Sequence, residues 1–110
     1  PSFMAAWPDA LLNIHPSLLP AFPGLDTHAR ALAAGCKVHG CTVHFVRAEV
    51  DTGPIVAQSA VPILDDDTPE TLAARVLAEE HRLFPQAVAW FAEGRLRVEG
   101  MRVRVAAAMG

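Results

Sequence analysis

Three polar side chains of this 110-residue sequence have the types and spacing needed for acyl transfer. Asn13 and His15 lie two positions apart at the end of a short apolar run, so on an extended backbone both point to the same face. An amide polarises a carbonyl group, and an imidazole donates a proton or stabilises a developing oxyanion. Asp51, in a glycine-bearing turn, is the natural third member. Its carboxylate would favour the imidazolium form of His15 and order a water molecule for proton relay.

The residue types alone also leave a plainer interpretation open. In that alternative, Asn13 and His15 cap the end of a strand, and Asp51 satisfies the backbone of its own turn. The choice depends on the elements that position the three side chains.

The first predicted elements are a strand and a rigid loop. The apolar run predicts a strand over residues 11–15 that ends at His15. The following stretch, PSLLPAFPG, holds Pro16, Pro20 and Pro23. Because each proline removes a backbone donor and fixes φ, this stretch is predicted to be an irregular but rigid loop.

A short helix and two strands are predicted next. The helix runs through HARALAAG, with Asp26 or Thr27 as its N-cap and Gly35 at its end. Strands are predicted over residues 38–46 and 54–63, because both segments are rich in β-forming residues.

A long helix and a hairpin complete the predicted order. Thr68 is a strong N-cap, Pro69 suits the first helical position, and an apolar stripe continues to Gly94. Pro85 is expected to kink or split this helix near His81. The segment RLRVEGMRVRV alternates around a Glu-Gly pair and predicts a hairpin.

The predicted fold class is therefore α/β, with residues 1–110 as a single unit. We expect a mixed sheet with antiparallel additions toward the carboxyl terminus, a long C-terminal helix and a terminal hairpin. Two helices are few for covering both faces of a parallel sheet, so the sequence looks like part of a larger fold.

Composition and net charge limit the classes of binding partner that the chain can have. The chain is 52% hydrophobic and 19% charged, with a formal charge of −3. Such a chain has no basic field for nucleic acid or an anionic membrane surface. Without a signal peptide or a membrane-spanning run, a cytoplasmic location is expected, and Cys36 and Cys41 are expected to be reduced.

Longer stretches of the sequence closely resemble a known family. The strings NIHPSLLPAFPGLDTHARAL and HGCTVHFVRAEVDTGPIVAQ, with TLAARVLAEEHRLFP in register, are similar to the phosphoribosylglycinamide formyltransferase family of purine biosynthesis. The resemblance runs from Leu11 to about Gly94. Formyltransferases that act on initiator methionyl-tRNA typically carry Arg-Gly where this chain has Phe22-Pro23-Gly24, and formyltetrahydrofolate hydrolases usually lack the HPSLLPAFPG wording.

The resemblance implies a direct transfer of the formyl group of 10-formyltetrahydrofolate to glycinamide ribonucleotide. Asn13 would bind the formyl group, His15 would donate the proton, and Asp51 would tune His15 and hold the relay water. No metal is implied. A loop would wrap the pterin of this folate co-substrate through backbone groups; it consists of Arg47, Ala48, Glu49, Val50 and Asp51.

Two positions on the long helix bear on the ribonucleotide. By the resemblance, Glu80 holds it, although a glutamate on a helix is also commonly just solvated. Leu77 departs from the family pattern, because some members carry a polar residue there. The resemblance therefore does not carry a polar contact with the ribonucleotide over to Leu77.

Other polar groups have open interpretations. Thr42 and His44 share one strand face and are expected to support the site. His44 would lie under Asp51 and orient it, although a satisfied sheet histidine fits equally well. His28 is expected at the surface. His39, Cys36 and Cys41 match no structural zinc spacing, so no metal site is expected. Trp7 and Trp90 are expected to serve packing.

The family fold is Rossmann-like and about twice as long, so this chain resembles its C-terminal half. No glycine-rich turn for the ribonucleotide phosphate occurs in the sequence. The chain alone is therefore expected to be inactive without the missing N-terminal half. The alternatives are an enzyme resembling methionyl-tRNA formyltransferase and a non-catalytic module that self-associates, for example as a homodimer, through a bare strand edge.

Overall fold

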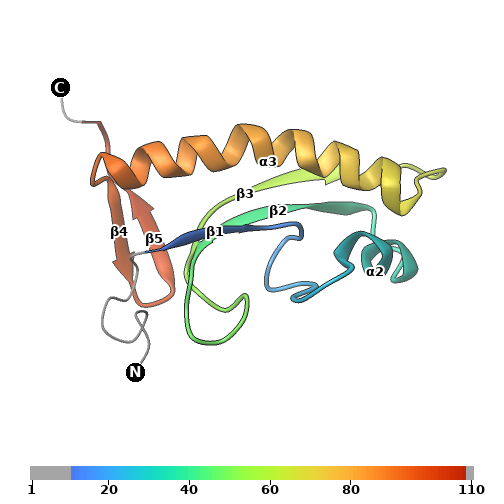
Figure 1. The fold of residues 1–110 in the computed structure, drawn as a ribbon, viewed down its shortest axis with the longest axis horizontal. Coiled ribbons are helices and arrows are strands. Elements are labelled where there is room, and N and C mark those ends of the chain that lie inside the picture. Colours follow the sequence, from blue (N-terminus) through green and yellow to red (C-terminus); the bar gives the residue numbers. More distant parts are fainter. Residues whose placement is uncertain (1–10, 109–110) are drawn as a thin grey trace.

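The computed structural model describes residues 11–108. Two helices and five strands occur there, with the fold class expected from the sequence (Figure 1). Their bounds, in chain order, are β1 Leu12–His15, α2 Thr27–Ala33, β2 Val38–Phe45, β3 Ile55–Pro62, α3 Pro69–Ala92, β4 Leu96–Glu99 and β5 Arg102–Val105.

The strands form one mixed sheet in the order β1-β2-β3-β5-β4. Among the described strands, β3 and β5 form the one parallel pair. Antiparallel pairs were expected toward the carboxyl terminus, where β4 pairs with β5, but β1–β2 and β2–β3 are antiparallel as well. The loop of residues 46–54 joins β2 directly to β3, which suits antiparallel neighbours, whereas β1 and β2 are antiparallel although helix α2 lies in the connection between them.

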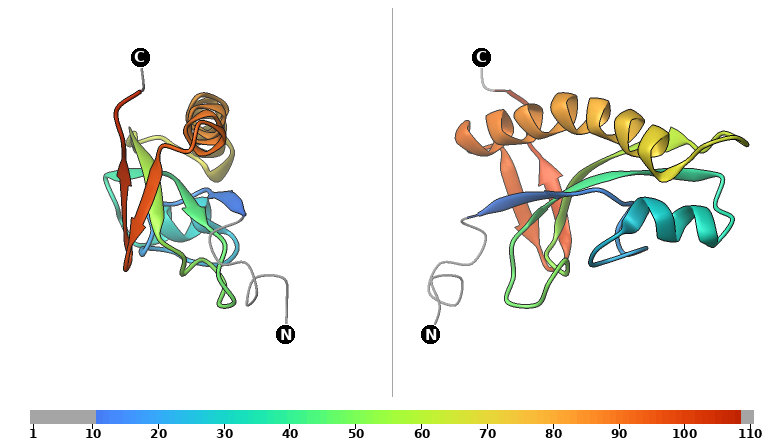
Figure 2. Two further views of the ribbon diagram at one scale, coloured as in Figure 1. Left: turned by 90° about the vertical axis from the view of Figure 1, so that its left-hand side faces the viewer. Right: turned by 45° about the vertical axis from the view of Figure 1, so that its right-hand side comes forward.

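The long helix α3 covers one face of the sheet (Figure 1). Its apolar stripe packs on β2 and β3. In Figure 1 and in the right-hand view of Figure 2, α2 and the β4–β5 hairpin lie near opposite ends of α3. Burial of apolar surface between these layers is the main stabilising contribution. The buried core consists of Cys41, Val43, Phe45, Val56, Val61, Leu72, Val76, Leu83 and Ala87.

Helix α3 begins as predicted but is not split by Pro85. The Thr68 side chain accepts a hydrogen bond from the Thr71 N–H in a capping box, and Pro69 takes the first helical position. The prediction of a split near His81 was wrong, because α3 continues through Pro85 to Ala92. Pro85 and His81, whose carbonyl loses its helical partner, are both exposed, while Leu83 and Ala87 remain buried.

Helix α2 is capped differently from the prediction. Asp26 occupies the N-cap position, but its φ of 56° is left-handed and its side chain makes no cap hydrogen bond. The Thr27 hydroxyl donates instead to the Pro16 carbonyl, at the start of the loop that follows β1. Thr27 therefore attaches the loop to α2 and does not cap the helix.

No helix among residues 11–108 is long and apolar enough to cross a membrane. Trp90 packs against the core as expected, and Trp7 lies outside the described residues.

Candidate active site

The register of β1 with β2 assembles the first part of the site. Asn13 is directly opposite His44, and His15 is directly opposite Thr42. Directly opposite residues of an antiparallel pair project from the same face of the sheet, so the four side chains share one face. Asn13 is exposed, whereas the other three are buried. The shared face of Asn13 and His15 that the spacing predicted is confirmed.

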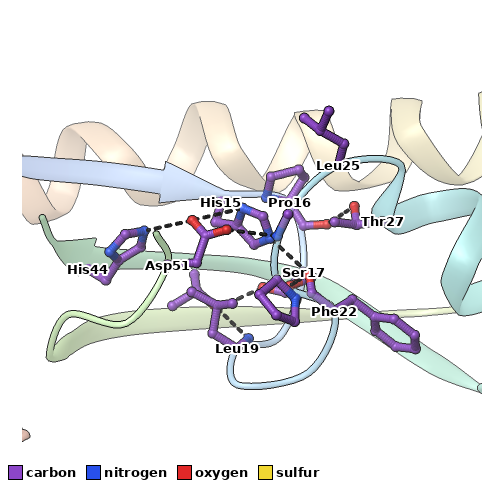
Figure 3. A network of polar contacts seen from close by, with 12 residues as sticks. His15, Pro16, Ser17, Leu19, Phe22, Leu25, Thr27, His44 and Asp51 are labelled. Atoms are coloured by element: carbon purple, nitrogen blue, oxygen red, sulfur yellow. Dashed lines mark hydrogen bonds and ion pairs between the residues drawn. The ribbon is translucent and has the colours of Figure 1, made fainter. Parts of the chain in front are cut away.

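Asp51 reaches this face from the loop between β2 and β3. Its Oδ1 lies 3.4 Å from His15 Nδ1 and 3.8 Å from His44 Nε2 (Figure 3). Its Oδ2 accepts a hydrogen bond of 2.8 Å from the Gly24 N–H. The φ of Asp51 is 57°, a left-handed conformation that aspartate tolerates better than most residues. The structure therefore brings Asp51, which is far from Asn13 and His15 in the sequence, to the sheet face that carries both of them.

Both ring nitrogens of His15 face oxygen atoms. Nε2 lies 2.9 Å from the Phe22 carbonyl, and Nδ1 faces the Asp51 carboxylate. A carbonyl oxygen only accepts hydrogen bonds, so Nε2 carries a proton in this arrangement. The ring of His15 therefore has an acceptor oxygen near each of its nitrogens.

His44 approaches the same carboxylate, that of Asp51, through its Nε2 atom. Its Nδ1 donates to the Phe45 carbonyl at 3.0 Å, which leaves Nε2 as the nitrogen nearest Asp51. This Nε2 is buried and has no hydrogen-bond partner among the described residues. His44 Nε2 therefore has unused hydrogen-bonding capacity beside Asp51 Oδ1.

Thr42 supports the loop that follows β1 and does not contact Asp51. Its hydroxyl donates to the Ser17 carbonyl at 2.7 Å and accepts from the Leu19 N–H at 3.1 Å. Gln58 on β3 adds bonds of 2.9 Å to the Leu19 carbonyl and 3.0 Å to Thr42 Oγ1. Backbone groups of this loop use the short side chain of Thr42, and the supporting role predicted for Thr42 stays a prediction.

Sequence reasoning missed the contribution of the loop backbone to the site. The Phe22 carbonyl accepts from His15 Nε2 and also, at 3.1 Å, from Ser17 Oγ. Phe22 has a φ of 52°, a region in which a bulky residue costs of order 1–3 kcal/mol and must be held by its surroundings. No residue-type signal points to a backbone carbonyl. The dense prolines indicated rigidity, but the direction of each carbonyl depends on the folded loop.

The loop expected to wrap the pterin lines a cavity. The cavity has a volume of about 270 Å³ and opens beside Asn13 and His44. The five predicted loop residues, Arg47, Ala48, Glu49, Val50 and Asp51, all line it. A second cavity of about 440 Å³ lies on the other side of Asp51, between the proline-rich loop, β3 and Met101 of the hairpin, and was not anticipated.

Glu80 lies close enough to the site to interact electrostatically with His15. Burial raises the pKa of the Glu80 carboxyl, while the nearby His81 and His15 lower it by a smaller amount. This half-buried carboxyl is therefore not simply solvated. Leu77, one turn earlier on α3, is exposed and stands on the same side of the helix.

The remaining histidines and cysteines form a separate cluster. His28 Nδ1 lies 3.2 Å from His39 Nε2, and burial is the main cause that lowers the pKa of each ring. His28 is partly buried, and a surface role for it, as opposed to catalysis, stays a prediction. Cys36 and Cys41 are free thiols, as expected. Among residues 11–108, no three histidine, cysteine or acidic side chains are grouped as metal ligands.

The sheet carries an amide and an imidazole on one face, with a carboxylate beside the imidazole and a cavity of about 270 Å³ next to the amide, an arrangement that suits acyl transfer. The family model described as Formyl transferase matches residues 1–88, and the chain belongs to this family.

Two similar proteins have the same specific activity in their names. The chain is 47% identical to phosphoribosylglycinamide formyltransferase of Escherichia coli K12 over 98 residues, which cover 89% of the chain and 46% of that protein. It is 60% identical to the crystal structure of glycinamide ribonucleotide transformylase 1 from Symbiobacterium toebii, with a TM-score of 0.91, covering 94% of the chain and 49% of that structure.

A formyltetrahydrofolate deformylase from Pseudomonas syringae pv. tomato is more distant in sequence. It is 28% identical with a TM-score of 0.89, covering 94% of the chain and 35% of that structure. The chain thus spans about half the length of its bacterial transferase relatives.

Proposed function

We propose that this chain forms the folate-binding and catalytic half of an enzyme that transfers the formyl group of 10-formyltetrahydrofolate to the amine of glycinamide ribonucleotide. The observation that carries the proposal is the convergence of Asn13, His15 and Asp51, with a distance of 3.4 Å between His15 Nδ1 and Asp51 Oδ1. The transferase names of the similar proteins support the choice of substrates.

The pterin part of the folate co-substrate would occupy the cavity beside Asn13. A pterin ring carries a row of hydrogen-bond donors and acceptors that backbone amide and carbonyl groups can match. The exposed residues Ala48, Glu49 and Val50 offer such backbone groups at the cavity wall. The formyl group would then lie against the face that carries the Asn13 amide, with Arg47 and Asp51 at the two ends of the loop.

The proposed reaction needs no covalent intermediate on the protein. The substrate amine attacks the formyl carbon, and the carbonyl π electrons move to oxygen to give a tetrahedral oxyanion. The Asn13 amide donates to this oxyanion, and the His15 imidazolium stabilises its charge. The C–N10 bond then breaks, N10 takes up a proton, and the attacking nitrogen loses one. The proton delivered to N10 comes from His15 directly or through a group held by Asp51.

His15 has to exchange a partner to act as a direct donor. In the structure its Nε2 proton is engaged by the Phe22 carbonyl, and Nδ1 faces Asp51. Substrate would therefore compete with Phe22 for Nε2. Asp51 keeps its place because the Gly24 N–H holds its second oxygen at 2.8 Å.

The ribonucleotide would be shared between this chain and the missing N-terminal half. Glu80 is the residue here that we assign to the ribonucleotide, through the sugar hydroxyl groups that a carboxylate can accept from. The phosphate needs an anion site such as a glycine-rich turn at a helix N-terminus, which the sequence lacks. The N-terminal half of the transferase would supply it.

Reconstitution tests the proposal. The chain is mixed with an N-terminal half prepared from the Escherichia coli relative, and formylated ribonucleotide and tetrahydrofolate are measured. We expect activity from the mixture, little from either half alone, and its loss with His15→Ala or Asp51→Asn. Full activity of both variants would overturn the site assignment.

Hydrolysis of the formyl group is a second candidate, favoured by the likeness to a deformylase and by the polar atoms beside Asp51 that suit a water molecule. Formate release in the absence of amine separates the two reactions. A transferase releases little formate until the amine is supplied, whereas a hydrolase does not respond to the amine.

Two further alternatives are tested with the same sample. A net charge of −3 gives no support to a tRNA substrate, and initiator methionyl-tRNA as the acceptor checks this directly. Strand β1 is at the edge of the described sheet, so a homodimer through this edge is the non-catalytic alternative. Sedimentation that is independent of concentration would exclude it.

A further inference from the structure

Arg30, on the exposed side of α2, makes three contacts with the loop that follows β1. Its Nη1 donates to the Pro23 carbonyl at 2.6 Å and to the Leu25 carbonyl at 2.9 Å. Its guanidinium carbon lies 5.5 Å from the centroid of the Phe22 ring. A guanidinium can donate in its plane and also attract an aromatic ring, so one side chain holds three residues of a four-residue segment.

The segment held by Arg30, residues 22–25, contacts both members of the imidazole–carboxylate pair. The Phe22 carbonyl faces His15 Nε2 at 2.9 Å, and the Gly24 N–H donates to Asp51 Oδ2 at 2.8 Å. The backbone of the segment therefore contacts His15 Nε2 and Asp51 Oδ2, while His15 Nδ1 and Asp51 Oδ1 face each other (Figure 3).

This segment needs external support to keep its shape. Phe22 has a left-handed φ of 52°, which a bulky residue adopts only when its surroundings enforce it. The supports inside the protein are the Ser17 hydroxyl, bonded to the Phe22 carbonyl at 3.1 Å, and the His39 ring, edge-on at 6.3 Å. Arg30 is the support on the solvent side, and it alone among these three contacts Pro23 and Leu25, which flank Gly24.

We infer that Arg30 is a positioning residue for the formyl transfer proposed above, and the inference rests on that function. It clamps residues 22–25, so that the Phe22 carbonyl and the Gly24 amide hold His15 and Asp51 at their working separation. Arg30 contacts backbone groups and a ring but neither reacting side chain, so its effect on the reaction passes through the loop.

The first test follows the Gly24 amide by hydrogen exchange in NMR. Arg30→Met removes the donors and keeps an unbranched apolar side chain, and Arg30→Lys restores a cation that can satisfy one carbonyl at a time. We expect exchange at Gly24 to rise about tenfold in Arg30→Met, equivalent to the loss of a typical hydrogen-bonded constraint, and to return partway in Arg30→Lys. Unchanged Gly24 exchange in Arg30→Met would overturn the clamp.

A matched control separates the clamp from general loss of an arginine. Arg97 also donates from Nη1 to a backbone carbonyl, that of Gly94 at 3.2 Å, but it lies in the hairpin. Arg97→Met should leave Gly24 exchange and the formyl-transfer rate unchanged. An equal effect of Arg97→Met and Arg30→Met would also overturn the inference.

The second test uses the enzyme reconstituted with its N-terminal half. Because the clamp orients catalytic groups and does not bind substrate, Arg30→Met should lower kcat about tenfold with KM for both substrates within roughly twofold of the parent. A raised KM with unchanged kcat would overturn the positioning role. If the unsubstituted enzyme transfers no formyl group, the proposed function fails, whereas the Gly24 exchange still decides whether Arg30 holds the loop.

Discussion

His15 Nδ1 lies 3.4 Å from Asp51 Oδ1, and each of the two side chains is only 8% exposed. Helix α2, strand β2 and their connecting loops separate the two residues in the chain, and the β1–β2 register with the left-handed turn at Asp51 brings them together. Low exposure strengthens their electrostatic interaction, because water does not screen it fully. The first prediction follows from this pair.

Asp51→Asn keeps the size of the side chain and removes its charge. The proton on His15 Nδ1 then loses its countercharge, and the asparagine can offer an amide hydrogen where the imidazole needs an acceptor. We expect kcat for formyl transfer by the reconstituted enzyme to fall about 10²–10⁴-fold. Asp66→Asn, on an exposed turn, is the control and should retain the parent rate. An active Asp51→Asn enzyme would contradict the role of the pair.

Glu80→Gln separates ribonucleotide binding from catalysis. Burial raises the pKa of this carboxyl, so its charged form is costly to hold in the free protein. We expect KM for the ribonucleotide to rise roughly tenfold, from the loss of charge-assisted hydrogen bonds, with KM for the folate unchanged and the melting temperature not lowered. Glu70→Gln, exposed in the first turn of α3, should leave both constants unchanged. A change in KM for the folate alone would reject this assignment.

Gly53→Ala tests the turn that presents Asp51. A Cβ at Gly53 would collide with the backbone carbonyl of Phe45, which belongs to the strand end and cannot move aside. We expect a loss of more than about 3 kcal/mol in the free energy of unfolding, measured by urea denaturation. Gly100→Ala is the comparison, since it has open space but a φ of 65°, and should cost about 1–2 kcal/mol. Equal losses would show that backbone strain, and not the collision, dominates.

The ion pair of Asp67 with Arg75 predicts a pH dependence of stability. The Arg75 guanidinium, with the Leu64 N–H and the Thr71 hydroxyl, holds the pKa of Asp67 well below its ordinary value of 3.8. A depressed folded-state pKa adds stability above the unfolded value, and that stability is lost as the pH falls through the folded value. Asp67→Asn should therefore lower the melting temperature at pH 6, with a difference from the parent that shrinks below about pH 4.

The control for this pH series is Asp65→Asn. Asp65 is fully exposed and 3.9 Å from Lys37, so its replacement should shift the melting temperature little at any pH. A difference between Asp67→Asn and the parent that stays constant from pH 3 to pH 7 would reject the linkage.

The two thiols should react at very different rates. Burial raises the pKa of Cys41 to about 11, with the carboxylates of Glu80 and Glu79 acting in the same direction. At pH 8 roughly one Cys41 in a thousand would be thiolate, while Cys36 is partly exposed. Iodoacetamide should label one thiol in the native chain, and mass spectrometry should locate it at Cys36. A Cys36→Ser chain should label only after unfolding, and rapid native labelling of that variant would contradict the prediction.

The positions of the regular elements were predictable because their signals are local. Thr68 and Pro69 mark the start of α3, and the Glu99–Gly100 pair marks the hairpin, through preferences that act within a few residues. Pro85 misled for the same reason. Its local preference opposes a helix interior, but burial of Leu83 and Ala87 against the sheet outweighs one lost hydrogen bond.

The site was predictable where it depends on side-chain type and spacing, and not where it depends on backbone direction. The two-residue spacing of Asn13 and His15 placed them on one face, and both the glycine-bearing turn and the resemblance indicated Asp51 as their partner. The Phe22 carbonyl, the Gly24 amide and the Arg30 clamp have no signature in residue type, because their roles depend on how a proline-rich loop folds back onto the sheet.

The sequence by itself determined which groups are available and the secondary structure that carries them, since capping, strand propensity and two-residue alternation act over short distances along the chain. Only the tertiary structure decided that Asp51 lies between His15 and His44, that Thr42 holds a loop, and that Glu80 is half-buried. Those outcomes depend on strand register and on the packing of α3, where residues far apart in the chain compete for the same space and the same hydrogen-bond partners.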